Sequence, residues 1–198
     1  MSFLSGSVQF ALVQKINLTM TQSDSLITKQ TLNWVRSFIM KYNLCPFAKG
    51  PVNKGTLRVA VSNTSKKAQA LEDLMTEIKY LDNHPEVETT LLVFANSFKL
   101  FFTYLDFVDI AERLLQEQDY EGVYQLATFH PDYYFADSEP EDISNYTNRS
   151  PYPMVHLLRE DNLEKAISAY GDTEIIPQRN SATLHELGLE KIKKIFED

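Results

Sequence analysis

The sequence contains only one cysteine, Cys45, and only six glycines among its 198 residues. A single cysteine excludes an internal disulfide bond, so packing alone must hold the fold together, as is usual in a reducing compartment. Phosphate-binding and dinucleotide-binding loops need glycines at fixed spacing, and no such motif occurs; HExxH and GxSxG patterns are absent as well. These absences argue against a P-loop NTPase, a dinucleotide-binding dehydrogenase and an α/β-hydrolase.

Positive charge is also scarce, with 19 lysine and arginine residues against 27 aspartate and glutamate residues and a net charge of −8. A nucleic-acid-binding protein needs cations to displace the counterions of the phosphates, so general nucleic-acid binding is disfavoured. No apolar run approaches the roughly 20 residues of a membrane helix, and the N-terminus lacks the basic region of a signal peptide. We therefore expect a cytoplasmic protein without a membrane or nucleic-acid partner. No motif indicates a cofactor.

The first 23 residues differ from the rest of the chain. Their apolar side chains roughly alternate, which permits an added strand, but translation that starts at Met20 explains the segment equally well. Residues 24–198 have the length and composition of one globular domain. We therefore expect an N-terminal extension over residues 1–23 and a single domain over residues 24–198.

Hydrophobic periodicity predicts alternating helices and strands in this domain. Helices are expected over residues 25–42, 65–81, 101–116, 161–170 and 175–187, and strands over residues 57–61, 89–94, 123–129 and 153–158. Two successive strand–helix–strand units predict parallel pairing, and we expect the last strand to be antiparallel. The predicted fold class is α/β, with one mixed sheet of about four strands that an N-terminal helix precedes in the sequence. An α+β fold is the alternative.

Ligands of open parallel sheets bind outside the carboxyl ends of the strands. Here these ends are residues 62–64, 95–97 and 130–132. Residues 130–152 then form a long stretch rich in aromatic side chains, and ordered loops of more than about 12–15 residues are usually functional. An antiparallel last strand brings Asn148 and Arg149 back to the edge that carries His130. This edge is the predicted functional site.

Four residues are candidates for catalysis: His130, Asp132, Cys45 and His156. His130 is the predicted acid–base group, because Asp132 can orient or charge its imidazole. His156 lies in the last predicted strand, so it either packs in the core or faces the same site as His130. Cys45 follows the end of the first helix, where the negative end of the helix dipole opposes a thiolate. A structural cysteine, a catalytic thiol and a metal ligand remain open for Cys45.

Arginine and amide side chains supply the predicted ligand-binding groups, because a guanidinium matches the geometry of a carboxylate or phosphate. Arg149, together with Asn148, is the predicted anion clamp. The wider binding set is Asn148, Arg149, Ser150, Arg159, Arg179 and Asn180. The alternative for the arginines is an internal ion pair.

Six short strings occur together in this chain: NLCPFA at residues 43–48, TTLLV at 89–93, FHPDY at 129–133, TNRSPYP at 147–153, HLLRE at 156–160 and RN at 179–180. In this combination the chain resembles the mainly bacterial family catalogued as domain of unknown function 1415, over about residues 28–187. The resemblance implies no particular activity. It does imply that the candidate site residues lie within the motifs of that family.

The sequence thus leads us to expect a small enzyme or small-molecule-binding protein that acts on an anionic ligand, with His130 as the acid–base group and Arg149 as the clamp. One alternative is a non-catalytic interaction module that docks through the aromatic loop 130–152. A second alternative is a metal-binding protein that uses Cys45, His130 and His156, although their spacing matches no compact zinc motif. Whether the protein is an enzyme stays open at this point.

Overall fold

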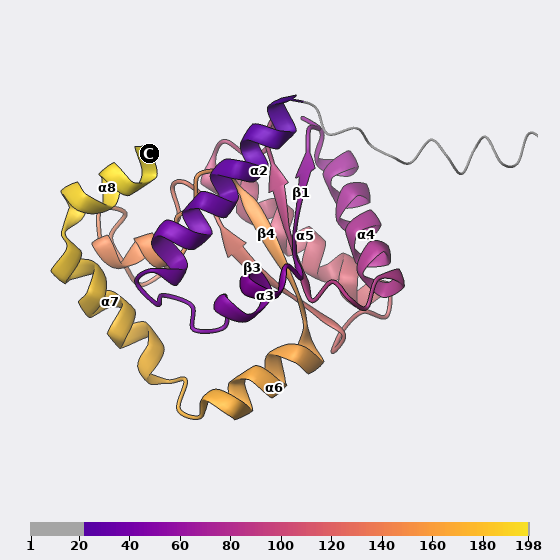
Figure 1. The fold of residues 1–198 in the computed structure, drawn as a ribbon. Helices are drawn as coiled ribbons and strands as arrows, with labels where there is room; N and C mark the ends of the chain where they lie inside the picture. The colour runs from indigo at the N-terminus through magenta and orange to yellow at the C-terminus, as the bar shows by residue number, and fades with distance from the viewer. Residues whose placement is uncertain (1–21, 198) are drawn as a thin grey trace, which may run out of the picture.

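The fold is a four-stranded mixed sheet with helices on both faces (Figure 1). A computed structural model describes residues 22–197. The strands are β1 (Leu57–Ser62), β2 (Thr89–Phe94), β3 (Tyr124–Phe129) and β4 (Met154–Arg159). The single-domain α/β prediction is confirmed. The predicted extension over residues 1–23 lies almost wholly outside the described residues.

The strand order is β1-β2-β4-β3. As predicted, β1 pairs with β2 in parallel, and β4 is antiparallel to both of its neighbours. The second parallel pair implied by the sequence, between β2 and β3, does not form, because β4 lies between them. β4 buries Met154 on one face and Val155 on the other, which suits a central position. β3 still runs in the direction of β1 and β2, so their carboxyl ends share one edge of the sheet.

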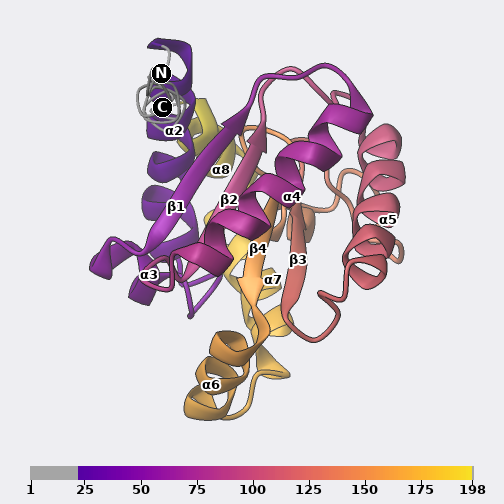
Figure 2. The same cartoon turned by 90° about the vertical axis from the view of Figure 1, so that its right-hand side faces the viewer.

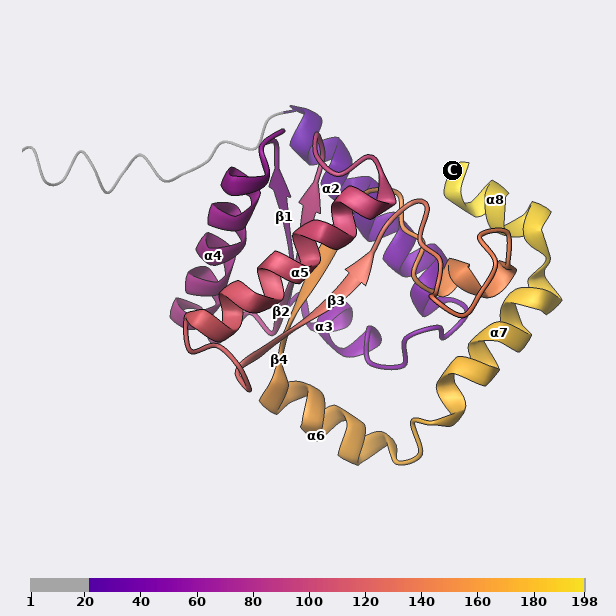
Figure 3. The ribbon, with the colours of Figure 1, turned by 180° about the vertical axis from the view of Figure 1, so that it is seen from behind.

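One face of the sheet is filled by core packing against α4 and α5 (Figures 2 and 3). These helices span Lys67–Asn83 and Phe101–Glu117. Their apolar stripes recur at helical spacing and include the completely buried Leu74 in α4 and Tyr104 in α5. The hydroxyl of Tyr104 donates to the backbone oxygen of Met154 at 2.7 Å, so this helix is also bonded to the central strand.

The opposite face is covered by more and shorter helices. They are α2 (Gln22–Trp34), the π-helix η1 (Val35–Met40), α3 (Lys49–Lys54), α6 (Glu160–Tyr170), α7 (Ile175–Leu187) and α8 (Leu189–Glu197). In Figure 1, α2 crosses the sheet and α6, α7 and α8 form an arc beside it. None of the helices between residues 22 and 197 is long and apolar enough to cross a membrane.

The sequence missed two of these helices and the character of a third. α3 is only six residues long, too short for its periodicity to be detected. α8 follows Gly188, where the predicted last helix ended, and it buries Ile192. The first predicted helix is α-helical only as far as Trp34 and continues as a π-helix, a form that is frequent at functional sites.

Candidate functional site

A cavity of about 1110 Å³ lies between the face of the sheet that α2 crosses and helices α3, α6 and α7. Most of its wall is apolar. Five residues of the predicted site line it, namely Cys45, Asn148, His156, Arg159 and Asn180. We call it the His156 cavity, because His156 is the one histidine among the described residues that line it.

The register of the sheet places His156 on the floor of the cavity. In β4 it lies opposite Leu91 of β2 and Ala127 of β3, and side chains directly opposite each other point to the same face. All three residues line the cavity. Nε2 of His156 lies 2.6 Å from Oγ1 of Thr89, and Oγ1 lies 2.6 Å from the backbone oxygen of Leu157.

Thr89 fixes the tautomer of this imidazole. A threonine hydroxyl has one proton, and the carbonyl of Leu157 can only accept it, so both contacts form only when Nε2–H of His156 donates to Oγ1. Nδ1 then carries a lone pair, and no described residue bonds to it. Burial lowers the pKa of His156 to about 4, so the ring is neutral at neutral pH. The cavity therefore presents a hydrogen-bond acceptor in apolar surroundings.

Cys45 starts a turn that leads into α3. The preceding helix η1 ends at Met40, and the turn that follows contains Asn43, whose left-handed φ is 54°. The backbone N–H groups of Phe47 and Ala48 lower the pKa of the Cys45 thiol, which opposes the effect expected from the negative end of a helix. The expected opposition of the helix dipole therefore does not decide its acidity.

Burial decides the protonation of Cys45 instead. It raises the pKa of the thiol, and this effect outweighs the two amides and the charge of Arg179, which lower it. The group is therefore a protonated thiol at neutral pH. Since the thiolate is the nucleophilic form, this environment favours the structural interpretation of Cys45 over the catalytic one.

Two side chains of α7 hold the turn that contains Cys45. Arg179 donates from Nη2 to the backbone oxygen of Asn43 at 2.6 Å, and Asn180 donates from Nδ2 to the backbone oxygen of Leu44 at 2.7 Å. Both were predicted to bind ligand. Their bonds position a segment 136 residues earlier in the chain, and Asn180 also lines the His156 cavity.

Replacing Asn180 with alanine is expected to speed alkylation of Cys45 by iodoacetamide about tenfold, because ~1.4 kcal/mol corresponds to that change in how often the turn opens. The substitution leaves the carbonyl of Leu44 without its buried donor, a loss of roughly 1–3 kcal/mol. Mass spectrometry of the native protein at neutral pH measures the rate. Gln178→Ala, exposed on the same helix, is the control; equal rates in the two variants would contradict the positioning role of Asn180.

His130 is bonded on both sides to the backbone. The side chain is completely buried. Its Nε2–H donates to the backbone oxygen of Phe98 at 2.8 Å, and its Nδ1 accepts from the backbone N–H of Asp132 at 3.0 Å. Neither ring nitrogen of His130 is therefore free for the predicted acid–base role. The contact with Asp132 is made by the backbone N–H of Asp132 and not by its carboxylate.

His130 and His156 lie on opposite faces of the sheet, contrary to the expectation that they share one site. Ala127 lies opposite His156, and His130 is three residues further along the chain. Because side chains alternate along a strand, an odd separation turns His130 to the other face. There its ring contacts those of Phe101 and Tyr104 from α5.

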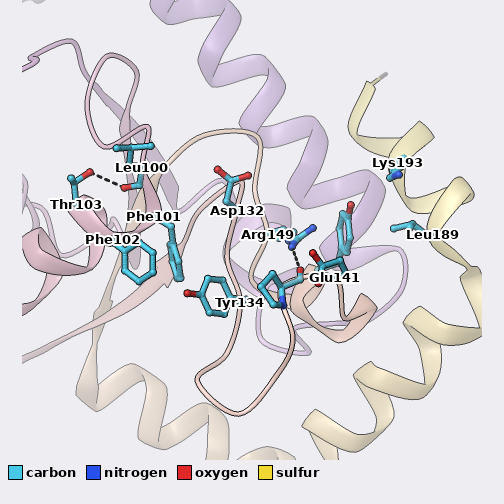
Figure 4. A pocket seen from close by; sticks show the side chains of 12 residues that line it. Leu100, Phe101, Phe102, Thr103, Asp132, Tyr134, Glu141, Arg149, Leu189 and Lys193 are labelled. Carbon is cyan, nitrogen blue, oxygen red and sulfur yellow. Dashed lines mark hydrogen bonds between the residues drawn. The ribbon is translucent and has the colours of Figure 1, made fainter.

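Asp132 and Arg149 line a second, more open pocket of about 600 Å³ (Figure 4). Arg149 donates from Nε to the backbone oxygen of Tyr133 at 3.1 Å and from Nη2 to that of Pro140 at 2.6 Å. The predicted anion clamp thus ties together the loop 130–152. Two highly exposed apolar side chains border this pocket, Leu100 and Phe102.

The other predicted binding residues also donate hydrogen bonds to backbone carbonyls. Asn148 donates from Nδ2 to the backbone oxygen of Thr128 at 3.1 Å, and the buried Ser150 donates to a backbone carbonyl two residues away. Arg159 donates from Nη2 to the backbone oxygen of Leu81 at 2.5 Å, near the end of α4. The predicted anion-binding set is therefore largely bonded to the protein's own main chain.

A sequence model of the family described as protein of unknown function, DUF1415, matches residues 26–194. The chain belongs to this family. The match covers the whole region over which the sequence resembled it. No curated protein and no solved structure matches the chain.

Between residues 22 and 197 of this DUF1415 protein, no three histidine, cysteine, aspartate or glutamate side chains are grouped so that they could hold a metal ion. Cys45 and His156 line the same cavity, but His130 lies across the sheet from it. The three residues named for a metal site therefore do not form one site.

Sequence reasoning missed Thr89, which orients the imidazole, and the aromatic wall of the cavity. Thr89 carried a weak signal, since it is the first of two polar residues at the start of a strand that is apolar from Leu91 to Phe94. The wall carried none, because Trp34, Phe47 and Phe129 belong to three segments that only the tertiary fold brings together.

Proposed function

We propose that this protein binds a small, largely apolar organic molecule in the His156 cavity. The cavity volume of about 1110 Å³ is slightly above the roughly 300–1,000 Å³ of most small-molecule sites. Such sites combine an apolar wall with a few polar groups that orient the ligand. Trp34, Phe47 and Phe129 supply this wall, and His156 supplies a polar group. The single cysteine supports a cytoplasmic location.

The observation that carries this proposal is the unpartnered Nδ1 of His156. Nε2 of the same ring is bonded to Thr89, whereas Nδ1 has no hydrogen-bond partner among the described residues and is not fully buried, so a molecule in the cavity can reach it. An acceptor left open at the wall of a cavity is typical of a group whose partner is a ligand. The π-helix supports the same conclusion, since it contributes Val35 and Ile39 to the wall.

Helix α6 adds support, because it forms part of the cavity wall without burying any of its own residues. Leu163 and Ala166 line the cavity from this helix. A seated ligand would cover these apolar side chains, and covering apolar surface is worth roughly 25 cal/mol per Å². The ligand would therefore complete the packing that α6 lacks.

The chemistry of the cavity favours binding over catalysis. An efficient general base has a pKa near the working pH, whereas the pKa of His156 is about 4. The raised pKa of Cys45 likewise keeps its sulfur in the poorly nucleophilic thiol form. His156 acts in this proposal as a hydrogen-bond acceptor.

The other functions considered from the sequence have less support. An anionic ligand would need free cations, but Arg149 and Arg179 donate to backbone carbonyls. Docking through the aromatic loop would need several exposed rings, but Phe135 is the one exposed ring between residues 130 and 152, since Tyr146 is buried and Tyr133 packs against Phe101.

Titration with the neutral dye Nile red, whose fluorescence rises in apolar surroundings, tests the proposal. We expect saturable binding to the wild type, and binding weaker by about tenfold or more, or ~1.4 kcal/mol, in Ala166→Trp, which puts an indole into the cavity. Ser168→Trp puts the same side chain on the exposed side of α6 and should bind like the wild type. Equal binding by both variants, or no saturable binding at all, would contradict the proposal.

A further inference from the structure

The ligand of the His156 cavity can be specified more closely than by its apolar character. We infer that it is an uncharged aromatic molecule with a hydroxyl or N–H group that donates a hydrogen bond to Nδ1 of His156. This inference rests on the proposed function and narrows it to a ligand class. The chemistry is that of a phenol or an indole rather than of a carboxylate or a phosphate.

The direction of the hydrogen bond follows from Thr89. Its hydroxyl proton is committed to the carbonyl of Leu157, so Nε2–H of His156 is committed to Thr89. Nδ1 of the neutral ring can only accept. A ligand that presents only acceptors, such as an ether, would place one lone pair against another and leave Nδ1 unsatisfied.

That the ligand is uncharged follows from the bonds that the charged side chains of the cavity already make. Four charged side chains of the described residues line the cavity, namely Lys54, Glu88, Arg159 and Lys165. Lys54 and Glu88 pair with each other at 2.9 Å, and Arg159 donates to three backbone carbonyls. Lys165 is exposed to solvent, where its charge is screened. A charged ligand would lose hydration in the cavity, and the N–H groups that Arg159 commits to backbone carbonyls are not free to replace that hydration.

The aromatic character follows from the wall. Four rings line the cavity, those of Trp34, Phe47, Phe129 and Phe135. Trp34 and Phe129 already meet edge to face, with 5.5 Å between their centroids. Aromatic rings prefer such offset and edge-to-face contacts with further rings, so a ring-bearing ligand fits this wall better than an aliphatic chain.

Three naphthalenes of similar size test the inference through displacement of Nile red. 2-Naphthol is neutral and donates, 2-methoxynaphthalene lacks the donor, and 2-naphthoate carries a negative charge. We expect 2-naphthol to bind the wild type roughly tenfold more tightly than 2-methoxynaphthalene, as one buried hydrogen bond allows, and more tightly than 2-naphthoate. In His156→Phe, which lacks the acceptor, the first two affinities should become nearly equal.

His156→Asn is the second variant, and its amide oxygen should preserve part of the preference for 2-naphthol even where His156→Phe folds poorly. Equal wild-type affinities for 2-naphthol and 2-methoxynaphthalene would overturn the donor requirement, and tighter binding of 2-naphthoate would overturn neutrality. Failure of all three to displace bound Nile red would overturn the aromatic class. In each case Nile red binding that is sensitive to Ala166→Trp leaves the proposed function standing, whereas no Nile red binding overturns both.

Discussion

Replacing His130 with alanine is expected to lower the free energy of unfolding by about 3–5 kcal/mol, the sum of a buried void and unpaired backbone groups. The side chain is completely buried, and its loss leaves the carbonyl of Phe98 and the N–H of Asp132 without their partner. Phe98 also has a φ of 58°, a strained value for a bulky residue, which the bond to His130 helps to hold. Urea denaturation measures the loss.

Nile red binding separates a structural role of His130 from a role in the site. Under conditions in which His130→Ala is still folded, dye binding should match the wild type, because His130 lies on the face that α5 covers. His130→Gln retains a donor and an acceptor and should recover part of the lost stability. A variant of normal stability that fails to bind would instead support the site role predicted for His130 from the sequence.

Acidification is expected to destabilise the wild type more than His156→Phe, by an additional ~3 kcal/mol on reaching pH about 4. Burial lowers the pKa of His156 from 6.5 to about 4. Between these values the unfolded imidazole binds a proton that the folded one does not, so stability falls as the pH falls through this window. Above pH about 6.5 both states are neutral and the two proteins should differ by a constant amount.

The measurement is urea unfolding of both proteins across this pH range. Burial also lowers the pKa of His130, and carboxylates titrate in both proteins, so only the difference between the two curves reports on His156. Parallel curves would show that water solvates the ring inside the cavity. They would contradict a neutral imidazole that is held ready for a ligand.

Local patterns were sufficient to predict most of the elements and the edge where the strands end. α4 and α5 carry continuous apolar stripes, and β2 is buried at every position and apolar from Leu91 to Phe94, so their types follow from short segments. The return of the chain beside His130 was predicted as well, and the backbone N–H of His130 donates to the oxygen of Asn148 at 3.2 Å. The position of β4 was not, because strand order depends on contacts between distant segments.

The sequence by itself determined the α/β class and the candidate residues, including Cys45 and His156, which line the cavity. Only the tertiary structure decided which histidine is available. The sequence favoured His130 because Asp132 is its near neighbour, but the register turned that ring into the core, since a shift of one residue along a strand reverses the face. The partner that orients His156 is Thr89, 67 residues away on another strand. No local pattern contains such a contact, because it forms only when the sheet assembles.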